Sequence, residues 1–346
     1  MAPPLRGLTP LLRLAAVLAL GLVFTLFILL LAGAPPFQTL FILFQGGMGS
    51  ATKLAQTLAV FAPLALCSSA LLFTFAAGLW NIGIEGQVVL GAVCATGLLR
   101  YGQGGGGTAI ALGLAAGMAG GALWAALAGG LKAWGRVHEI FSGLGLNFVA
   151  LGLTLWLIFG PWKRPGVASM SGTTPFDESL WLPELFGLPV GPVSLILAVA
   201  GLVAVALILG RTYWGLSLKA VGQNREASTM LGLKPDRRVI EAMAACGALA
   251  GLAGALQVAA VYHRLIPAIS SNYGYTGLLV VMMASYRPRL VPFICLFFAC
   301  LNVGSIQLPL QLQIDSSLSG VLQGALVLSV FTVQGLEQAL VKRSRA

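Results

Sequence analysis

The sequence predicts an all-α polytopic membrane protein with about ten transmembrane helices and cytoplasmic N- and C-termini. Only 9% of its 346 residues are charged and 58% are apolar, and the mean hydropathy is +0.92. A soluble chain carries about 25% charged residues, so too little charge is present here to cover a surface that faces water. The apolar runs are continuous and lack the alternation of a barrel strand, which leaves helices as the structure that can span a membrane.

Ten intervals free of Asp, Glu, Lys and Arg are the candidate crossings. They are residues 14–52, 54–84, 86–99, 101–131, 140–162, 185–210, 242–263, 265–286, 290–314 and 316–336. Most are long enough for a crossing of about 20 residues. We expect 86–99 and 265–286 to be short, broken or tilted elements, because the former is short and the latter opens on the polar residues 270–272.

The first interval is longer than one helix. Residues 14–31 are expected to form a retained first helix, followed by an outer loop that begins at Pro35-Pro36. A cleaved secretory signal ending at residues 32–34 is the alternative, but secretory cores usually run for about 7–15 residues and this run is longer. We therefore treat residues 1–346 as a single transmembrane domain.

Basic residues set the expected orientation. With cytoplasmic termini, fifteen of the twenty Lys and Arg residues fall in cytoplasmic segments and five in outer segments, as the positive-inside rule requires. The formal charge of +10 is thus assigned to orientation, and no nucleic-acid partner is expected. The two longest loops are then an outer loop at 161–191 and a cytoplasmic loop at 211–238.

Cysteine and histidine offer little chemistry. The five cysteines all lie inside apolar runs, where we expect inert, buried side chains and no bound metal. His138 and His263 are expected in loops on opposite sides of the membrane. No catalytic constellation is therefore predicted, and the chain is not expected to be an enzyme.

The segment Gly78–Gln87 inserts polar residues between two apolar runs. It reads Gly-Leu-Trp-Asn-Ile-Gly-Ile-Glu-Gly-Gln. A carboxylate at membrane depth is costly and normally functional, so Asn81, Glu85 and Gln87 are predicted to lie at a translocation path or its gate. The alternative is a tight cytoplasmic hairpin in which Glu85 faces water and caps the following helix.

Asn147 is an amide inside the apolar run 140–162. It is predicted either to bind a hydroxyl or base edge of a substrate or to hold two helices together, since both are ordinary roles of intramembrane amides. Glycines that recur every fourth residue, at 113, 117 and 121 and at 247 and 251, predict close helix interfaces.

Residues 215–227 in the cytoplasmic loop read as a short amphipathic helix that ends near residues 232–235. A rigid polar helix on the surface is suited to dock into the groove of a partner. The alternative is an interfacial helix held by its basic residues at anionic headgroups.

Three segments carry a resemblance to a known family. They are Asn-Ile-Gly-Ile-Glu-Gly-Gln at 81–87, Lys-Ala-Val-Gly-Gln-Asn at 219–224 and the Ala/Gly run at 247–255. Over about residues 50–335 the chain resembles permeases of bacterial ABC importers in the branched-chain amino acid and simple-sugar superfamily. It is most similar to the longer permease of nucleoside importers. It departs from that pattern at Trp80, where Phe is usual, and at His138, where Asn is common and where we expect a solvated loop residue.

The resemblance implies a permease in the bacterial inner membrane that moves nucleosides, or simple sugars, to the cytoplasm from a substrate-binding lipoprotein. It implies a second permease subunit, a shorter paralogue in a heteromer, and a cytoplasmic ATPase that carries ATP and Mg, so that this chain holds no cofactor. It also implies that residues 217–232 form a coupling helix. The residues assigned to coupling are Lys219, Gly222, Gln223, Asn224, Arg225, Ala227 and Gly232.

The rival prediction is an ion-coupled secondary transporter of a small polar solute. Such a transporter typically places carboxylates or histidines within its spans. Apart from Glu85 near a boundary, this chain has none in the middle of a predicted span, which favours the ABC permease.

Overall fold

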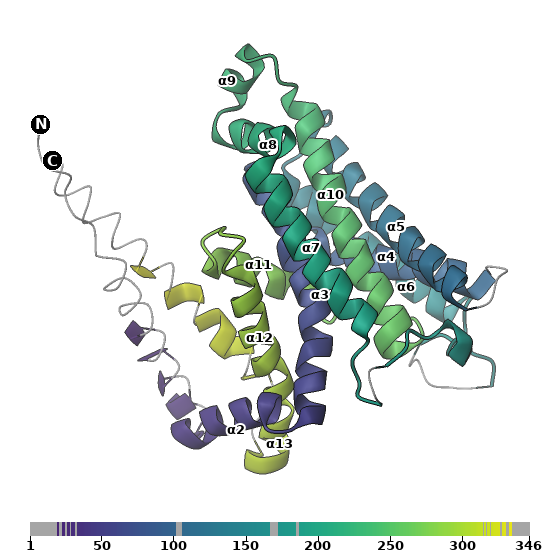
Figure 1. Cartoon of the computed structure of the whole chain (residues 1–346), viewed down its shortest axis with the longest axis vertical. Coiled ribbons are helices and arrows are strands. Elements are labelled where there is room, and N and C mark those ends of the chain that lie inside the picture. Colours follow the sequence, from purple (N-terminus) through teal and green to yellow (C-terminus); the bar gives the residue numbers. More distant parts are fainter. Residues whose placement is uncertain are drawn as a thin grey trace, which may run out of the picture. The chain divides into compact units, whose positions relative to one another are not determined.

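The computed structural model describes residues 33–101, 106–166, 172–184 and 187–313. It also describes 19–20, 23–24, 26–27, 29–31, 315, 317–318, 320–325, 327–329 and 332–333. These residues form helices and connecting turns without a β-strand (Figure 1). The predicted all-α class is confirmed.

Six helical stretches in the described part are long and apolar enough to cross a membrane. They are α3 (Ala51–Ala76), α5 (Gly107–Ala133), α6 (Glu139–Phe159), α7 (Pro192–Arg211), α10 (Pro235–Leu256) with the π-helical turn η2 (Gln257–Tyr262), and α12 (Val291–Ser305) with α13 (Gln307–Leu312). Two shorter helices, α4 (Ile84–Tyr101) and α11 (Tyr273–Met283), occupy the intervals expected to be short or broken. The chain is thus a multi-pass membrane protein.

The outermost predicted crossings are only partly described. Half of residues 14–31 lie outside the described residues, as do several positions of 316–336. One expectation nearby is wrong: Pro35-Pro36 does not open a loop, because helix α2 (Pro36–Met48) begins there with a proline in its first turn. A proline at this position has its fixed φ preset for the helix and lacks an N–H that would be unpaired anyway.

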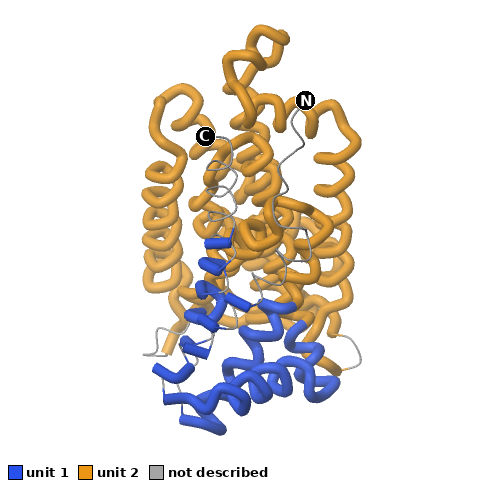
Figure 2. Tube along the Cα trace, turned by 90° about the vertical axis from the view of Figure 1, so that its left-hand side faces the viewer, with its two compact units in different colours: residues 1–57, 297–346 blue, residues 58–296 orange. Residues whose placement is uncertain are grey.

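Contacts divide the chain into two compact units, which Figure 2 colours separately. In the unit formed by residues 1–57 and 297–346, small residues of α2 meet α12. A Cβ built on Gly46 would lie 2.8 Å from the Cα of Gly304. The hydroxyl of Thr57 donates to the Gly47 carbonyl at 2.7 Å.

In the unit formed by residues 58–296, glycines bring α4, α5 and α10 together. A Cβ built on Gly121 of α5 would lie 2.7 Å from the Cα of Gly251 on α10. A Cβ built on Gly254 of α10 would lie 2.9 Å from the Ala92 nitrogen of α4. In lipid, helices associate through such close approach of small residues, so the interfaces predicted from the glycine spacing are confirmed for α5 and α10.

The segment 211–238 is mostly helical rather than a loop. Instead of the single helix expected at 215–227, it holds α8 (Tyr213–Gln223) and α9 (Arg225–Met230), and α10 begins at Pro235. The break falls at Asn224, whose backbone is extended at φ −154° and ψ 110° and whose side chain accepts a hydrogen bond from the Ala227 N–H. Asparagine is a preferred N-cap, so Asn224 ends one helix and starts the next.

Candidate functional site

The turn between α3 and α4 carries the polar motif of residues 78–87. Gly78, at φ +73°, lets the chain leave α3 in a left-handed conformation that favours glycine. Asn81 and Gln87 are both buried, and their amides pair reciprocally at 3.1 and 3.0 Å. Asn81 also lies 3.2 Å from the Cys246 sulfur on α10. The pair therefore fastens the turn to the first part of α4.

Glu85 lies in the first turn of α4 and is only 7% exposed. The alternative in which it faces water is therefore wrong. One of its oxygens accepts a hydrogen bond from the Gly274 N–H at 2.8 Å, in the first turn of α11. Unpaired N–H groups and the helix dipole both favour an anion at a helix N-terminus, so Glu85 joins the starts of α4 and α11.

Asn147 on α6 makes three hydrogen bonds. Its oxygen accepts from the Gly86 N–H at 2.8 Å, and its nitrogen donates to the Ile82 carbonyl at 3.0 Å and to the Tyr275 hydroxyl at 3.2 Å. Asn147 thus holds α6 to the polar motif, which is the helix-joining role, one of the two roles predicted for it. Asn147 is half-buried, and Tyr275 is 38% exposed.

Tyr275 was missed in the sequence. The signal available was the polar stretch at 270–272, which is followed by Tyr-Gly-Tyr-Thr in an otherwise apolar interval. Ser271 and Asn272 adopt left-handed conformations just before α11. Irregular backbone at membrane depth is tolerated where it is buried in protein or lines a cavity, so this break is a place to look for functional groups.

Of the residues predicted to act in coupling, Lys219 and Gly222 contact the bundle. The Lys219 ammonium donates to the Leu209 carbonyl near the end of α7 at 2.6 Å. A Cβ built on Gly222 would lie 2.8 Å from the Gly78 nitrogen. The helix α8 is therefore packed directly against the turn that begins the polar motif.

The other predicted coupling residues lie around α9. Gln223, Asn224, Arg225, Ala227 and Gly232 are all exposed. Arg225 forms an ion pair with Asp236 at the start of α10, and Gly232 has a φ of +78° in the turn after α9. The structure thus separates a packed helix, α8, from an exposed one, α9.

The described part of segment 161–191 holds one short 3-10 turn, η1 (Glu178–Leu180), and pairs with the chain after η2. The Phe176 N–H donates to the His263 carbonyl at 2.9 Å, and the Trp181 ring stacks on the His263 ring with centroids 4.0 Å apart. Burial lowers the pKa of His263 below its usual value. His138, in contrast, is exposed as predicted but caps α6 by accepting from the Ile140 N–H at 3.4 Å.

The polar atoms gathered between α4, α6 and α11 are amides, a hydroxyl and one carboxylate, which recognise polar solutes by hydrogen bonding. Among the described residues no group of three or more His, Cys, Asp or Glu is placed to hold a metal ion.

Comparison with known proteins gives a family match over residues 53–331, to the family described as the permease component of branched-chain amino acid transport systems. The chain is 29% identical to the glucose ABC transporter permease protein TsgB13 of Haloferax volcanii, over 94% of this chain and 87% of that protein. It is 26% identical to the guanosine ABC transporter permease protein NupP of Bacillus subtilis, over 90% of each. It is 28% identical to NupQ, a guanosine permease protein of the same organism, over 67% of this chain and 75% of that protein.

Proposed function

Since the chain belongs to the permease family of branched-chain amino acid transport systems, we propose that it imports nucleosides or simple sugars. It is a permease subunit of an ABC transporter, and ATP is hydrolysed by a separate ATPase. The relatives named for guanosine and glucose support this class of substrate. Both kinds of solute carry the ring hydroxyls that amide and phenol groups bind.

The proposed path for the solute runs past Asn147 and Tyr275. These two side chains are the partly exposed members of the polar cluster, whereas Asn81, Glu85 and Gln87 lie behind them in buried positions. In this arrangement the buried three shape the path and Asn147 touches the solute. Recognition is loose, because a lipoprotein outside the membrane supplies the affinity.

The proposed coupling surface is the segment 211–238, which faces the cytoplasm. The single observation that carries this proposal is the approach of Gly222 to Gly78, because it joins the segment to the turn that holds the polar motif. ATP binding can favour one arrangement of the bundle only through contacts that differ between the two arrangements. The exposed helix α9 offers such contacts to the ATPase, and α8 transmits the resulting displacement to the bundle.

The proposed topology has about ten crossings in one domain, 1–346, in the bacterial inner membrane, with both termini and 211–238 inside and 161–191 outside. The proposed assembly contains this chain, a shorter paralogous permease, an ATPase that holds ATP and Mg, and a substrate-binding lipoprotein. NupP and NupQ are two related guanosine permeases of one organism, which supports a heteromeric pair.

Uptake of radiolabelled nucleosides and ribose tests this proposal, in cells that express the whole transporter with or without its ATPase. We expect nucleoside uptake that needs the ATPase and is reduced in Glu85→Gln while the protein is still inserted. Uptake that persists without the ATPase and collapses with the proton gradient would replace the proposal with an ion-coupled transporter.

A further inference from the structure

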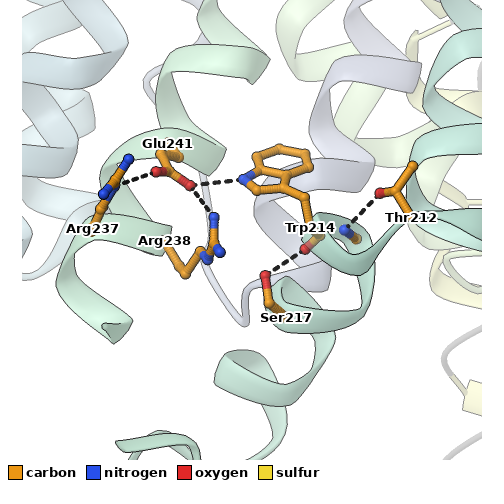
Figure 3. Close-up of polar contacts among 7 residues, drawn as sticks. Thr212, Trp214, Ser217, Arg237, Arg238 and Glu241 are labelled. Carbon is orange, nitrogen blue, oxygen red and sulfur yellow. Dashed lines mark hydrogen bonds and ion pairs between the residues drawn. The ribbon is translucent and has the colours of Figure 1, made fainter. Parts of the chain in front are cut away.

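The carboxylate of Glu241 on α10 accepts a hydrogen bond from the side chain of Trp214, at the start of α8 (Figure 3). The indole N–H donates to Oε2 of Glu241 at 2.8 Å. The same carboxylate binds the guanidinium groups of Arg237 at 2.7 Å and Arg238 at 2.6 Å. Both arginines belong to α10, so Trp214 is the only one of these three donors that reaches Glu241 from a different helix.

Trp214 also contacts a third helix. Its ring meets that of Phe73 on α3 edge to face, with centroids 5.3 Å apart. The Thr212 hydroxyl caps α8 by accepting from the Gly215 N–H at 3.0 Å, and it donates back to Ile208 of α7. The first turn of α8 is therefore fixed to α3, α7 and α10.

The other end of α8 is fixed at Gly222, against Gly78. A helix of 11 residues held at one end can pivot about that end. Held at both ends, it moves together with the groups at those ends. A displacement of α8 is therefore passed to the polar motif through Gly222 and to α10 through Trp214.

A displacement of α10 can in turn move α4, because the two helices are in close contact. Gly254 of α10 packs against the backbone of Val88 and Ala92, one to two turns after Glu85. The two attachments of α8 thus converge on α4, whose first turn contains Glu85 and Gln87.

We propose that Glu241 is a positioning residue for transport. Its hydrogen bond from Trp214 makes α8 and α10 move together when the ATPase acts. This inference rests on the proposed role of the segment 211–238 in coupling. It assigns to Glu241 no contact with the solute or with ATP.

The test uses the complete transporter in proteoliposomes and measures solute molecules taken up per ATP hydrolysed. Glu241→Gln and Glu241→Leu remove the same charge from Arg237 and Arg238, but only Leu also removes the acceptor for Trp214. Trp214→Phe removes the donor and keeps a ring against Phe73. We expect Glu241→Leu and Trp214→Phe to lower the ratio roughly tenfold, which corresponds to the loss of one hydrogen bond to a charged group. Glu241→Gln should lower the ratio distinctly less than Glu241→Leu does, because it keeps a neutral acceptor for Trp214.

The double variant Trp214→Phe/Glu241→Leu should be no worse than either single variant, because each breaks the same bond. Equal losses in the Gln and Leu variants would overturn the proposal by showing that the ion pairs within α10 matter instead. Gly222→Trp is the reference. If the ratio is lowered in Gly222→Trp but normal in Trp214→Phe and Glu241→Leu, the proposed role of Glu241 is overturned and the coupling role of the segment stands. A normal ratio in an inserted Gly222→Trp protein overturns the proposed coupling role of the segment itself.

Discussion

Gly222 on α8 and Gly78 in the turn after α3 lie backbone to backbone. A Cβ built on Gly222 would lie 2.8 Å from the Gly78 nitrogen, and one built on Gly78 would lie 3.1 Å from the Cα of Gly222. Both distances are too short for an ordinary contact of a side chain. Two motifs separated by more than a hundred residues in the chain thus meet where neither leaves room for a methyl group.

Gly222→Ala is therefore expected to destabilise the protein by about 1–3 kcal/mol, the usual cost of forcing an extra carbon into a packed site. Gly210→Ala is the matched control, because a Cβ at Gly210 of α7 would meet nothing within 4 Å. The midpoint of thermal unfolding in detergent should fall for Gly222→Ala and not for Gly210→Ala. Equal midpoints for the two variants would mean that the close approach is absent.

The amide pair Asn81–Gln87 should behave as one unit. Asn81→Leu or Gln87→Leu alone leaves the other amide buried without its partner, at a cost of about 1–3 kcal/mol. The double variant removes both amides, so its loss of stability should be smaller than the sum of the two single losses. Thermal unfolding of the four proteins measures this coupling, and strictly additive losses would contradict the pairing.

Gly274 should tolerate a side chain less well than its neighbour Gly277. A Cβ on Gly274 would meet the Glu85 carboxylate and would lie 3.0 Å from the Glu85 nitrogen, whereas one on Gly277 would lie 3.3 Å from its nearest neighbour atoms. Gly274→Ala should therefore separate α11 from α4 and lower the amount of folded protein more than Gly277→Ala. The reverse order in size-exclusion profiles would argue against the contact of Glu85 with α11.

Tyr275→Phe tests the proposed path. The change removes one hydroxyl, and Asn147 keeps its bonds to Gly86 and Ile82, so folding should be unaffected. If this hydroxyl faces the solute, the external concentration that gives half-maximal uptake should change while the amount of inserted protein stays constant. An unchanged concentration dependence would confine Tyr275 to a structural role.

Low pH should weaken the contact of the segment 161–191 with the chain after η2. Burial lowers the pKa of His263 in the folded state, so protonation favours the unfolded state, in which a histidine titrates near 6.5. The stabilisation is complete above about pH 6.5 and is lost as the pH falls toward the lowered pKa. Between pH 7.5 and 5.5 the unfolding midpoint should fall more for the wild type than for His263→Phe, which keeps a ring against Trp181. Parallel curves for the two proteins would contradict this account.

Much of the fold follows from hydrophobicity, which acts locally and can be read along the chain. The charge-free runs located both ends of α6 within three residues and the end of α7 within one, and the glycine spacing identified the close faces of α5 and α10. The start of α2 at Pro36 and the break at Asn224 were missed because both depend on capping, where one residue can end a helix or begin it.

The site could be predicted only in part, because its contacts join residues far apart in the sequence. The polar motif was visible as an interruption of apolar runs, but nothing local shows that Glu85 would meet Gly274. Tyr275 and Trp214 resemble ordinary aromatic residues of a membrane protein until their partners, Asn147 and Glu241, are brought beside them.

In the proposed mechanism, transport is driven through α8. The most direct measurement compares wild type, Gly222→Trp and Gly210→Trp as complete transporters in vesicles, with ATP hydrolysis and nucleoside uptake recorded in the same sample. We expect uptake to be lost in Gly222→Trp and retained in Gly210→Trp, with all three proteins inserted in equal amounts. Normal uptake driven by ATP in the Gly222→Trp protein would contradict it.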